Sequence, residues 1–146
     1  MMNTKQIVLD HVTRKGACGF GIDEASSAKS VQDLINLLLT PKGIEHCMEY
    51  RFPSIDVLLS NKEDLLSNNV FVEGKHSLSN PKLVIAFGGE IAIECDGYSV
   101  VEVYATNDAK IHVSAKDHSC VFVELHHNAS LEFSQVDNGL VKEFRK

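Results

Sequence analysis

The feature that most constrains this chain is a ten-residue repeat that begins near residue 81 and continues through residue 146. In blocks of ten, the segment is PKLVIAFGGE, IAIECDGYSV, VEVYATNDAK, IHVSAKDHSC, VFVELHHNAS, LEFSQVDNGL and VKEFRK. The first and third positions are apolar, as in a strand that buries alternate side chains on one face. Positions seven and eight carry turn formers, and position nine is small, so the chain is able to bend sharply beside its neighbour. The first position holds Ile91, Val101, Ile111, Val121, Leu131 and Val141.

Two folds satisfy this period. One is an antiparallel β-meander or sandwich with short hairpins, and the other is a β-solenoid with two repeats per coil, in which residue i stacks on residue i+20. The ninth position favours the solenoid, because Ser99 and Ser119 are separated by twenty residues, as are Ala109 and Ala129. The Asn-Gly or Asp-Gly pairs that mark tight hairpins are missing between the strands, apart from Asp96-Gly97 at the start of the array. The repeat therefore predicts a β-solenoid of unknown handedness.

The first part of the chain has a helical pattern. Residues 1–75 are predicted to form a helical N-terminal segment that caps the β-repeat region, residues 76–146, giving one compact α+β unit. Pro53 stops the longest helix, and Val70–Val72 is a short extended stretch before a turn at Glu73-Gly74. The predicted helices cover residues 5–13, 30–38 and 41–52, with two shorter ones capped by Ser54 and Ser60.

Composition narrows the class of protein. Of the 146 residues, 44% are hydrophobic and 23% are charged, as in a soluble globular protein. The net charge of −6 is spread over both halves, so no basic face for nucleic acid is expected. No apolar run reaches the roughly 20 residues that span a bilayer, and no secretory leader is evident, so we expect a cytoplasmic protein without a membrane partner. The four cysteines are far apart in sequence and are expected to be free, mostly buried thiols.

Three stretches carry a resemblance to other proteins: GIEHCMEYRFPSIDVLL, VFVEG and the array that begins NPKLVIAFGG. Together they resemble small uncharacterised proteins encoded in prophages and mobile elements of gut bacteria, over about residues 30–146. Those proteins share a helical stretch with a cysteine, an aromatic-Pro-Ser step and short C-terminal β repeats. The resemblance implies an accessory or structural role in a mobile element, and it carries no catalytic residues.

A protein-interaction surface is predicted on outward positions of the repeat, at Glu102, Tyr104, Phe122 and Glu124. Phe122 is the strongest candidate among them, because an exposed aromatic side chain suits an interface. We therefore expect a non-enzymatic interaction or structural module that binds a protein partner or a second copy of itself. A third possible function, an acidic protein that mimics nucleic acid, is supported by the net charge of −6 alone.

Catalytic and metal-binding chemistry finds little support in the sequence. His112 and Glu132 are expected side by side on an outer face, where they form a candidate acid/base dyad or, without a pocket, a surface pair. The coil register puts no two histidines in the same column, so no metal or cofactor is predicted. The sequence does not settle whether the chain is an enzyme. The alternative function is a small ligand-binding protein or hydrolase that uses a groove between the helical segment and the first coil, with His76, Tyr98 or Glu90.

Overall fold

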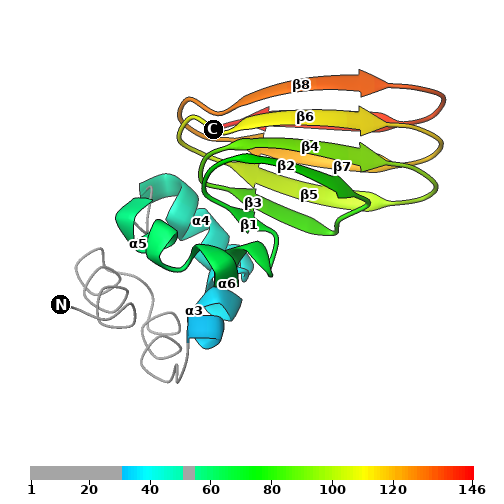
Figure 1. The fold of residues 1–146 in the computed structure, drawn as a ribbon. Coiled ribbons are helices and arrows are strands. Elements are labelled where there is room, and N and C mark those ends of the chain that lie inside the picture. Colours follow the sequence, from blue (N-terminus) through cyan, green and yellow to red (C-terminus); the bar gives the residue numbers. More distant parts are fainter. Residues whose placement is uncertain (1–30, 51–54) are drawn as a thin grey trace. The chain divides into compact units, whose positions relative to one another are not determined.

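A computed structural model describes residues 31–50 and 55–146 of the chain (Figure 1). The chain divides into two compact units between Asn68 and Asn69. The first unit is helical and the second is a β-solenoid, which confirms the α+β prediction. The predicted helix over residues 5–13, the first residue of the helix predicted over residues 30–38 and the predicted cap at Ser54 lie outside the described residues.

The helical unit contains α3 (Val31–Leu38), α4 (Pro41–Tyr50), α5 (Ile55–Ser60) and α6 (Lys62–Leu66). Thr40 caps the start of α4, because its hydroxyl Oγ1 accepts a hydrogen bond from the Gly43 amide at 3.1 Å. The cap proposed at Ser60 is wrong: Ser60 is the last residue of α5, and α6 begins after Asn61. The apolar stripes are buried as the helical spacing predicts, at Leu34, Ile35, Ile44, Cys47, Met48, Leu58 and Leu65.

The β unit is built from nine short strands in two parallel sheets (Figure 1). The chain alternates between the sheets, so two consecutive strands make one coil. Every strand pair is parallel, which confirms the solenoid and shows the antiparallel meander to be wrong. One sheet has the order β1-β3-β5-β7-β9 and the other has the order β2-β4-β6-β8. The strands are β1 (Val70–Phe71), β2 (Lys75–Ser79), β3 (Leu83–Ala86), β4 (Glu90–Cys95), β5 (Val100–Ala105), β6 (Lys110–Ala115), β7 (Cys120–Leu125), β8 (Ser130–Gln135) and β9 (Leu140–Arg145).

The core consists of apolar side chains stacked from coil to coil. Val101 lies beside Val121, and Val121 lies beside Val141, each pair separated by twenty residues as predicted. In the other sheet, Ile91 pairs with Ile111 in the same way. These side chains are buried because the alternation of a strand turns every first, third and fifth position of a block inward.

From β4 onward, each turn between strands contains a residue in the left-handed backbone region, always at position seven of the block. Gly97, Asn107, Asp117, His127 and Asp137 all have φ between 57° and 59°. Glycine adopts this region freely, and Asn, Asp and His are enriched there among the other residues, which explains the choice at this position. Gly139 serves a different purpose, because a Cβ at this position would collide with the Ala115 carbonyl oxygen.

The first coils are shorter than the ten-residue pattern predicts. Lys75 pairs with Glu90 fifteen residues later, and Leu83 pairs with Glu102 nineteen residues later. Three-residue connections, such as Phe87 to Gly89 between β3 and β4, replace the four-residue turns of the later coils. Strand β2 was therefore not predicted, because its sequence KHSLS lies outside the period.

Two polar side chains occupy core-facing positions at the C-terminal end of the stack. Gln135 and Arg145 stand at position five, where Cys95, Ala115 and Leu125 are buried. The Gln135 Oε1 atom accepts a hydrogen bond from the Val141 amide at 2.7 Å. The Arg145 guanidinium donates to the carbonyl oxygens of His127 at 3.1 Å and Ala129 at 2.6 Å. These side chains satisfy backbone groups at the end of the stack.

The valine ladder predicts a clear difference between two Val→Ala substitutions. Val121→Ala removes buried methyl groups and should lower the free energy of unfolding by roughly 2 kcal/mol. Val136→Ala makes the same change at a turn residue that is 53% exposed, and it should cost less than about 0.5 kcal/mol. Urea denaturation of both variants measures the difference, and equal losses would contradict the stacked core.

The turn geometry predicts opposite responses at Asp137, an exposed residue with φ of 58°. Asp137→Gly should keep or slightly raise stability, because glycine accepts this backbone region without strain. Asp137→Val should lower the free energy of unfolding by about 1–2 kcal/mol, because a β-branched side chain clashes with its own backbone there. Thermal unfolding of both variants tests the assignment, which fails if valine is tolerated as well as glycine.

Candidate functional site

The four residues predicted as an interaction surface lie together on the outer face of the β5–β7 pair. Glu102 is directly beside Phe122, and Tyr104 is directly beside Glu124, on adjacent strands of one sheet. Each alternates with a buried residue, so all four side chains point away from the core. They lie together because the stacking places each residue beside the residue twenty positions later. Glu102 is therefore beside Phe122, and Tyr104 is beside Glu124.

The same face contains apolar residues that the ten-residue pattern did not single out. Val100, Cys120 and Leu140 form a row across β5, β7 and β9, and Val100 is 60% exposed. Phe144 adds an exposed aromatic ring on β9, beside Glu124, whereas Phe122 itself is half-buried and not exposed as expected. We call the nine outward side chains of β5, β7 and β9 the β7 face: Val100, Glu102, Tyr104, Cys120, Phe122, Glu124, Leu140, Lys142 and Phe144.

Blocks of twenty, rather than ten, would have revealed this row. Position ten is Val100, Cys120 and Leu140 in alternate blocks, whereas the blocks between have Glu90, Lys110 and Ser130. Because consecutive blocks belong to opposite sheets, the first set lies on one outer face and the second set on the other. The two outer faces therefore differ in polarity, and one of them is rich in exposed apolar side chains.

The charges of the β7 face are partly paired. The Lys146 ammonium lies 3.2 Å from the Glu124 carboxylate, and the Lys142 ammonium lies 5.9 Å from the centroid of the Phe122 ring. Burial, followed by the nearby carboxylates of Glu102 and Glu124, raises the pKa of Tyr104, so its phenol stays protonated. The face thus presents neutral aromatic rings, aliphatic groups and a few charges.

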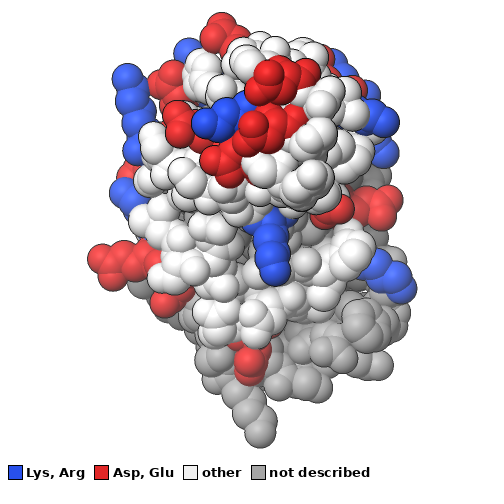
Figure 2. Space-filling model, turned by 90° about the vertical axis from the view of Figure 1, so that its right-hand side faces the viewer, with Lys and Arg blue, Asp and Glu red and all other residues white. Residues whose placement is uncertain are grey.

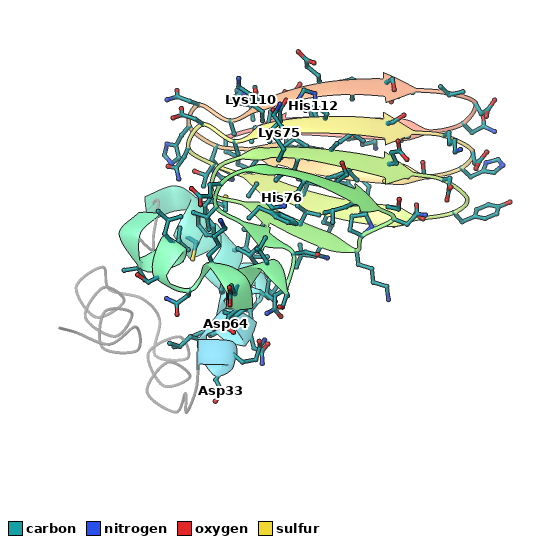
Figure 3. The ribbon with its side chains drawn as sticks, in the orientation of Figure 1. Asp33, Asp64, Lys75, His76, Lys110 and His112 are labelled. Carbon is teal, nitrogen blue, oxygen red and sulfur yellow. The ribbon has the colours of Figure 1, made fainter. Side chains whose placement is uncertain are left out.

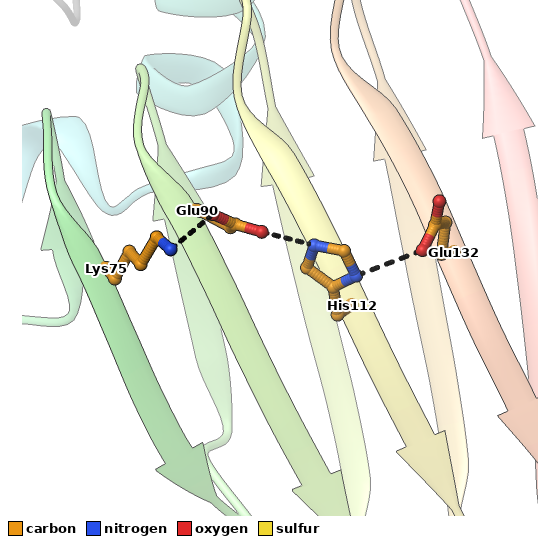
Figure 4. A network of polar contacts seen from close by, with 4 residues as sticks. All are labelled: Lys75, Glu90, His112 and Glu132. Atoms are coloured by element: carbon orange, nitrogen blue, oxygen red, sulfur yellow. Dashed lines mark hydrogen bonds and ion pairs between the residues drawn. The ribbon is translucent and has the colours of Figure 1, made fainter.

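The opposite outer face, on β2, β4, β6 and β8, carries a ladder of ion pairs (Figure 4). The predicted dyad is present there, with His112 Nδ1 at 3.4 Å from the Glu132 carboxylate. A second carboxylate, that of Glu90, lies closer, at 2.9 Å from His112 Nε2. Lys75 extends the ladder to Glu90 at 3.8 Å. The second carboxylate was missed because Glu90 reaches His112 diagonally, past the small side chain of Ala92.

This ladder has the geometry of a surface salt bridge rather than of an acid/base pair. Both ring nitrogens of His112 already face a carboxylate, and a neutral imidazole has only one N–H with which to donate. The His112 side chain is 38% exposed and the Glu132 side chain is 83% exposed, so water reaches the pair freely. Exposed pairs of this kind contribute about 0–1 kcal/mol to stability. We therefore assign the ladder to the cohesion of the sheet surface.

The residues of the alternative hydrolase site do not converge. His76 occupies a core-facing position beside Ile91, where its ring lies 4.6 Å from the Phe71 ring (Figure 3). Glu90 precedes Ile91 and points to the outer face, toward His112. Tyr98 is in the turn after β4, at the far end of that strand, and stacks on His118. These three side chains therefore do not form an acid/base group within the β unit.

The turns that follow β4, β6 and β8 form a second polar stack. The Tyr98 and His118 rings are stacked nearly parallel with their centroids 5.0 Å apart, and the Asn138 amide lies 3.5 Å from His118 Nδ1. His118 therefore lies between Tyr98 and Asn138, each twenty residues away from it. Figure 2 looks at this end of the strands and shows acidic side chains gathered around a basic one. The turns also contain Asp117, whose carboxylate accepts a hydrogen bond from the Gly97 amide, so part of this charge serves the backbone.

The cysteines have the properties of packing residues. Burial raises the pKa of Cys47 to about 12, and burial with the nearby Asp96 carboxylate raises the pKa of Cys95 to about 11. Both thiols stay protonated near neutral pH, so neither is a ready nucleophile. Cys120 is half-buried on the β7 face, and these three cysteines are free. Cys18 lies outside the described residues.

Comparison with known proteins supplies no identification: the chain matches no family model, no curated protein and no solved structure. Within residues 31–50 and 55–146, no group of histidine, cysteine and carboxylate side chains is arranged to hold a metal ion. No helix in this part of the chain is long and apolar enough to cross a membrane.

His126 gives a pH-dependent prediction. Burial lowers the pKa of His126. The nearby His127 and Lys146 lower this pKa further, whereas Glu124 opposes the shift. Below the ordinary histidine pKa of about 6.5, the unfolded chain takes up a proton that the folded chain resists, so stability should fall as the pH drops. His126→Gln removes this titration and should reduce the loss of stability between about pH 7 and pH 5. Urea midpoints at both pH values measure this, and identical losses in wild type and variant would contradict it.

Proposed function

We propose that this protein is a non-enzymatic interaction module whose binding surface is the β7 face. The observation that carries the proposal is the row of exposed apolar side chains at Val100, Leu140 and Phe144, next to Phe122, on one outer face of a rigid stack. Exposed apolar patches with a charged rim are typical of protein-binding surfaces. A stacked solenoid holds such a face flat and in fixed register, which favours recognition of a folded partner.

The contrast between the two faces of the same coils supports this choice. The outward residues of β2, β4, β6 and β8 are polar apart from Ala92, and the ladder from Lys75 through Glu90 and His112 to Glu132 pairs part of their charge. That face has no need of a partner to cover it. The β7 face places three aromatic rings, those of Tyr104, Phe122 and Phe144, among aliphatic groups. Burying these rings against a partner would be favourable, because aromatic side chains contribute strongly at interfaces.

The proposal includes a mobile-element setting and a cytoplasmic location. The first is supported by the resemblance of residues 30–146 to small prophage-encoded proteins. The second is supported by Cys47 and Cys95, which serve as buried, protonated thiols in the two cores, a state that suits a reducing compartment.

The test compares one substitution on each face. Phe122→Glu places a charge at the centre of the β7 face, whereas Ser114→Glu places the same charge on the exposed surface of β6. Tagged wild type and both variants are produced in the cell of origin, cross-linked and purified, and the masses of their complexes are measured. Phe122→Glu should reduce the yield of complexes at least about tenfold, while Ser114→Glu should leave it unchanged.

Circular dichroism shows whether both variants keep their β structure. A wild-type protein recovered only as a free monomer would contradict the proposal. An equal loss of complexes in the two variants would contradict the choice of the β7 face.

A further inference from the structure

The β7 face has a pattern that matches itself. Along the stack, position two of the outward side chains is Glu102 on β5, Phe122 on β7 and Lys142 on β9. A negative charge and a positive charge therefore stand on opposite sides of an aromatic ring. The neighbouring positions repeat this symmetry in apolar form, with Val100 and Leu140 on either side of Cys120.

We infer that the β7 face pairs with the β7 face of a second copy of this chain, about a two-fold axis parallel to strand β7. This inference rests on the proposed function and names its partner. Such an axis leaves the position along each strand unchanged and exchanges β5 with β9. Glu102 of one copy then faces Lys142 of the other, twice in each dimer, and the Phe122 rings of the two copies meet at the axis.

The remaining contacts agree with this axis. Val100 faces Leu140 of the second copy, and Tyr104 faces Phe144, so each exposed apolar group finds another. Glu124 faces its own equivalent, and the like charges are compensated because Lys146 lies 3.2 Å from each Glu124 carboxylate. The interface would thus contain an apolar centre with two symmetric ion pairs.

The charge pattern also excludes the other simple arrangement. A two-fold axis through Phe122 along the length of the stack would leave every strand facing itself. Glu102 would then face Glu102, and Lys142 would face Lys142. Like charges placed opposite each other across an interface cost several kcal/mol, so the pattern selects antiparallel stacks.

The area of contact sets the expected strength. Three outward side chains on each of three strands give nine residues per copy, fewer than the roughly 20–30 of a standard interface. The dimer should therefore be in exchange with the monomer, with a dissociation constant on the order of micromolar or weaker.

The decisive experiment is a charge exchange. Sedimentation equilibrium of the full chain, from about 1 µM to about 1 mM, measures dimerisation of wild type, E102K, K142E and the double variant E102K/K142E. Each single substitution creates two like-charge contacts and should weaken the dimer at least tenfold. The double variant restores opposite charges and should return to within about threefold of the wild-type constant.

E94K provides the matched control, because Glu94 is an exposed outward residue of β4 on the opposite face. It changes the net charge as E102K does and should leave dimerisation unchanged. Recovery in the double variant also shows that the single variants lost pairing rather than folding.

Cys120 supplies an independent readout, since its row crosses the axis at β7. A short bis-maleimide linker should join Cys120 to Cys120 of the second copy. Mass spectrometry of the linked peptides identifies the product, and its yield should be much lower in E102K.

A wild type that stays monomeric over the whole range, or a double variant as weak as the single ones, would overturn the inference. If the wild type is monomeric alone but forms complexes with another protein that Phe122→Glu abolishes, self-pairing is wrong while the proposed function stands.

Discussion

Parallel stacking of inward apolar side chains is the interaction on which the whole β unit depends. Each coil alone buries very little, because its inward residues have partners only in the coils above and below. The pairs Val101–Val121 and Val121–Val141 show the register that makes this burial continuous. A shift by one residue would turn the charges of the outer faces inward and expose the valines. The core therefore fixes, at the same time, which side chains are presented outside.

Much of this arrangement follows from the sequence, because the strand period and the coil period are both visible in it. The apolar first and third positions predicted the core, and the turn formers predicted the corners. The sequence could not predict strand β2, because the first coil is closed by a shorter connection and KHSLS has no match in the later blocks. The resulting offset of fifteen residues depends on two short strands and on the three-residue connections 80–82 and 87–89, which a period of ten does not encode.

The candidate surface was predictable only in part, for a similar reason. Phe122 and its three neighbours stand at outward positions of any ten-residue model, so they could be named in advance. The row formed by Val100, Cys120 and Leu140 could be predicted only if alternate blocks were known to belong to one sheet. The approach of Glu90 to His112 depends on side-chain conformation around Ala92, and no sequence pattern specifies it.

The polar side chains at the C-terminal end of the stack bear on how copies of this protein meet in solution. A solenoid whose last coil presented only apolar core positions would be a template for end-on growth into filaments. Gln135 already accepts a hydrogen bond from the Val141 amide, and Arg145 already donates to the carbonyls of His127 and Ala129. Another coil placed there would have to break these bonds and bury a guanidinium group, although Phe133 remains 47% exposed nearby. These bonds oppose the addition of a further coil at this end of the described stack.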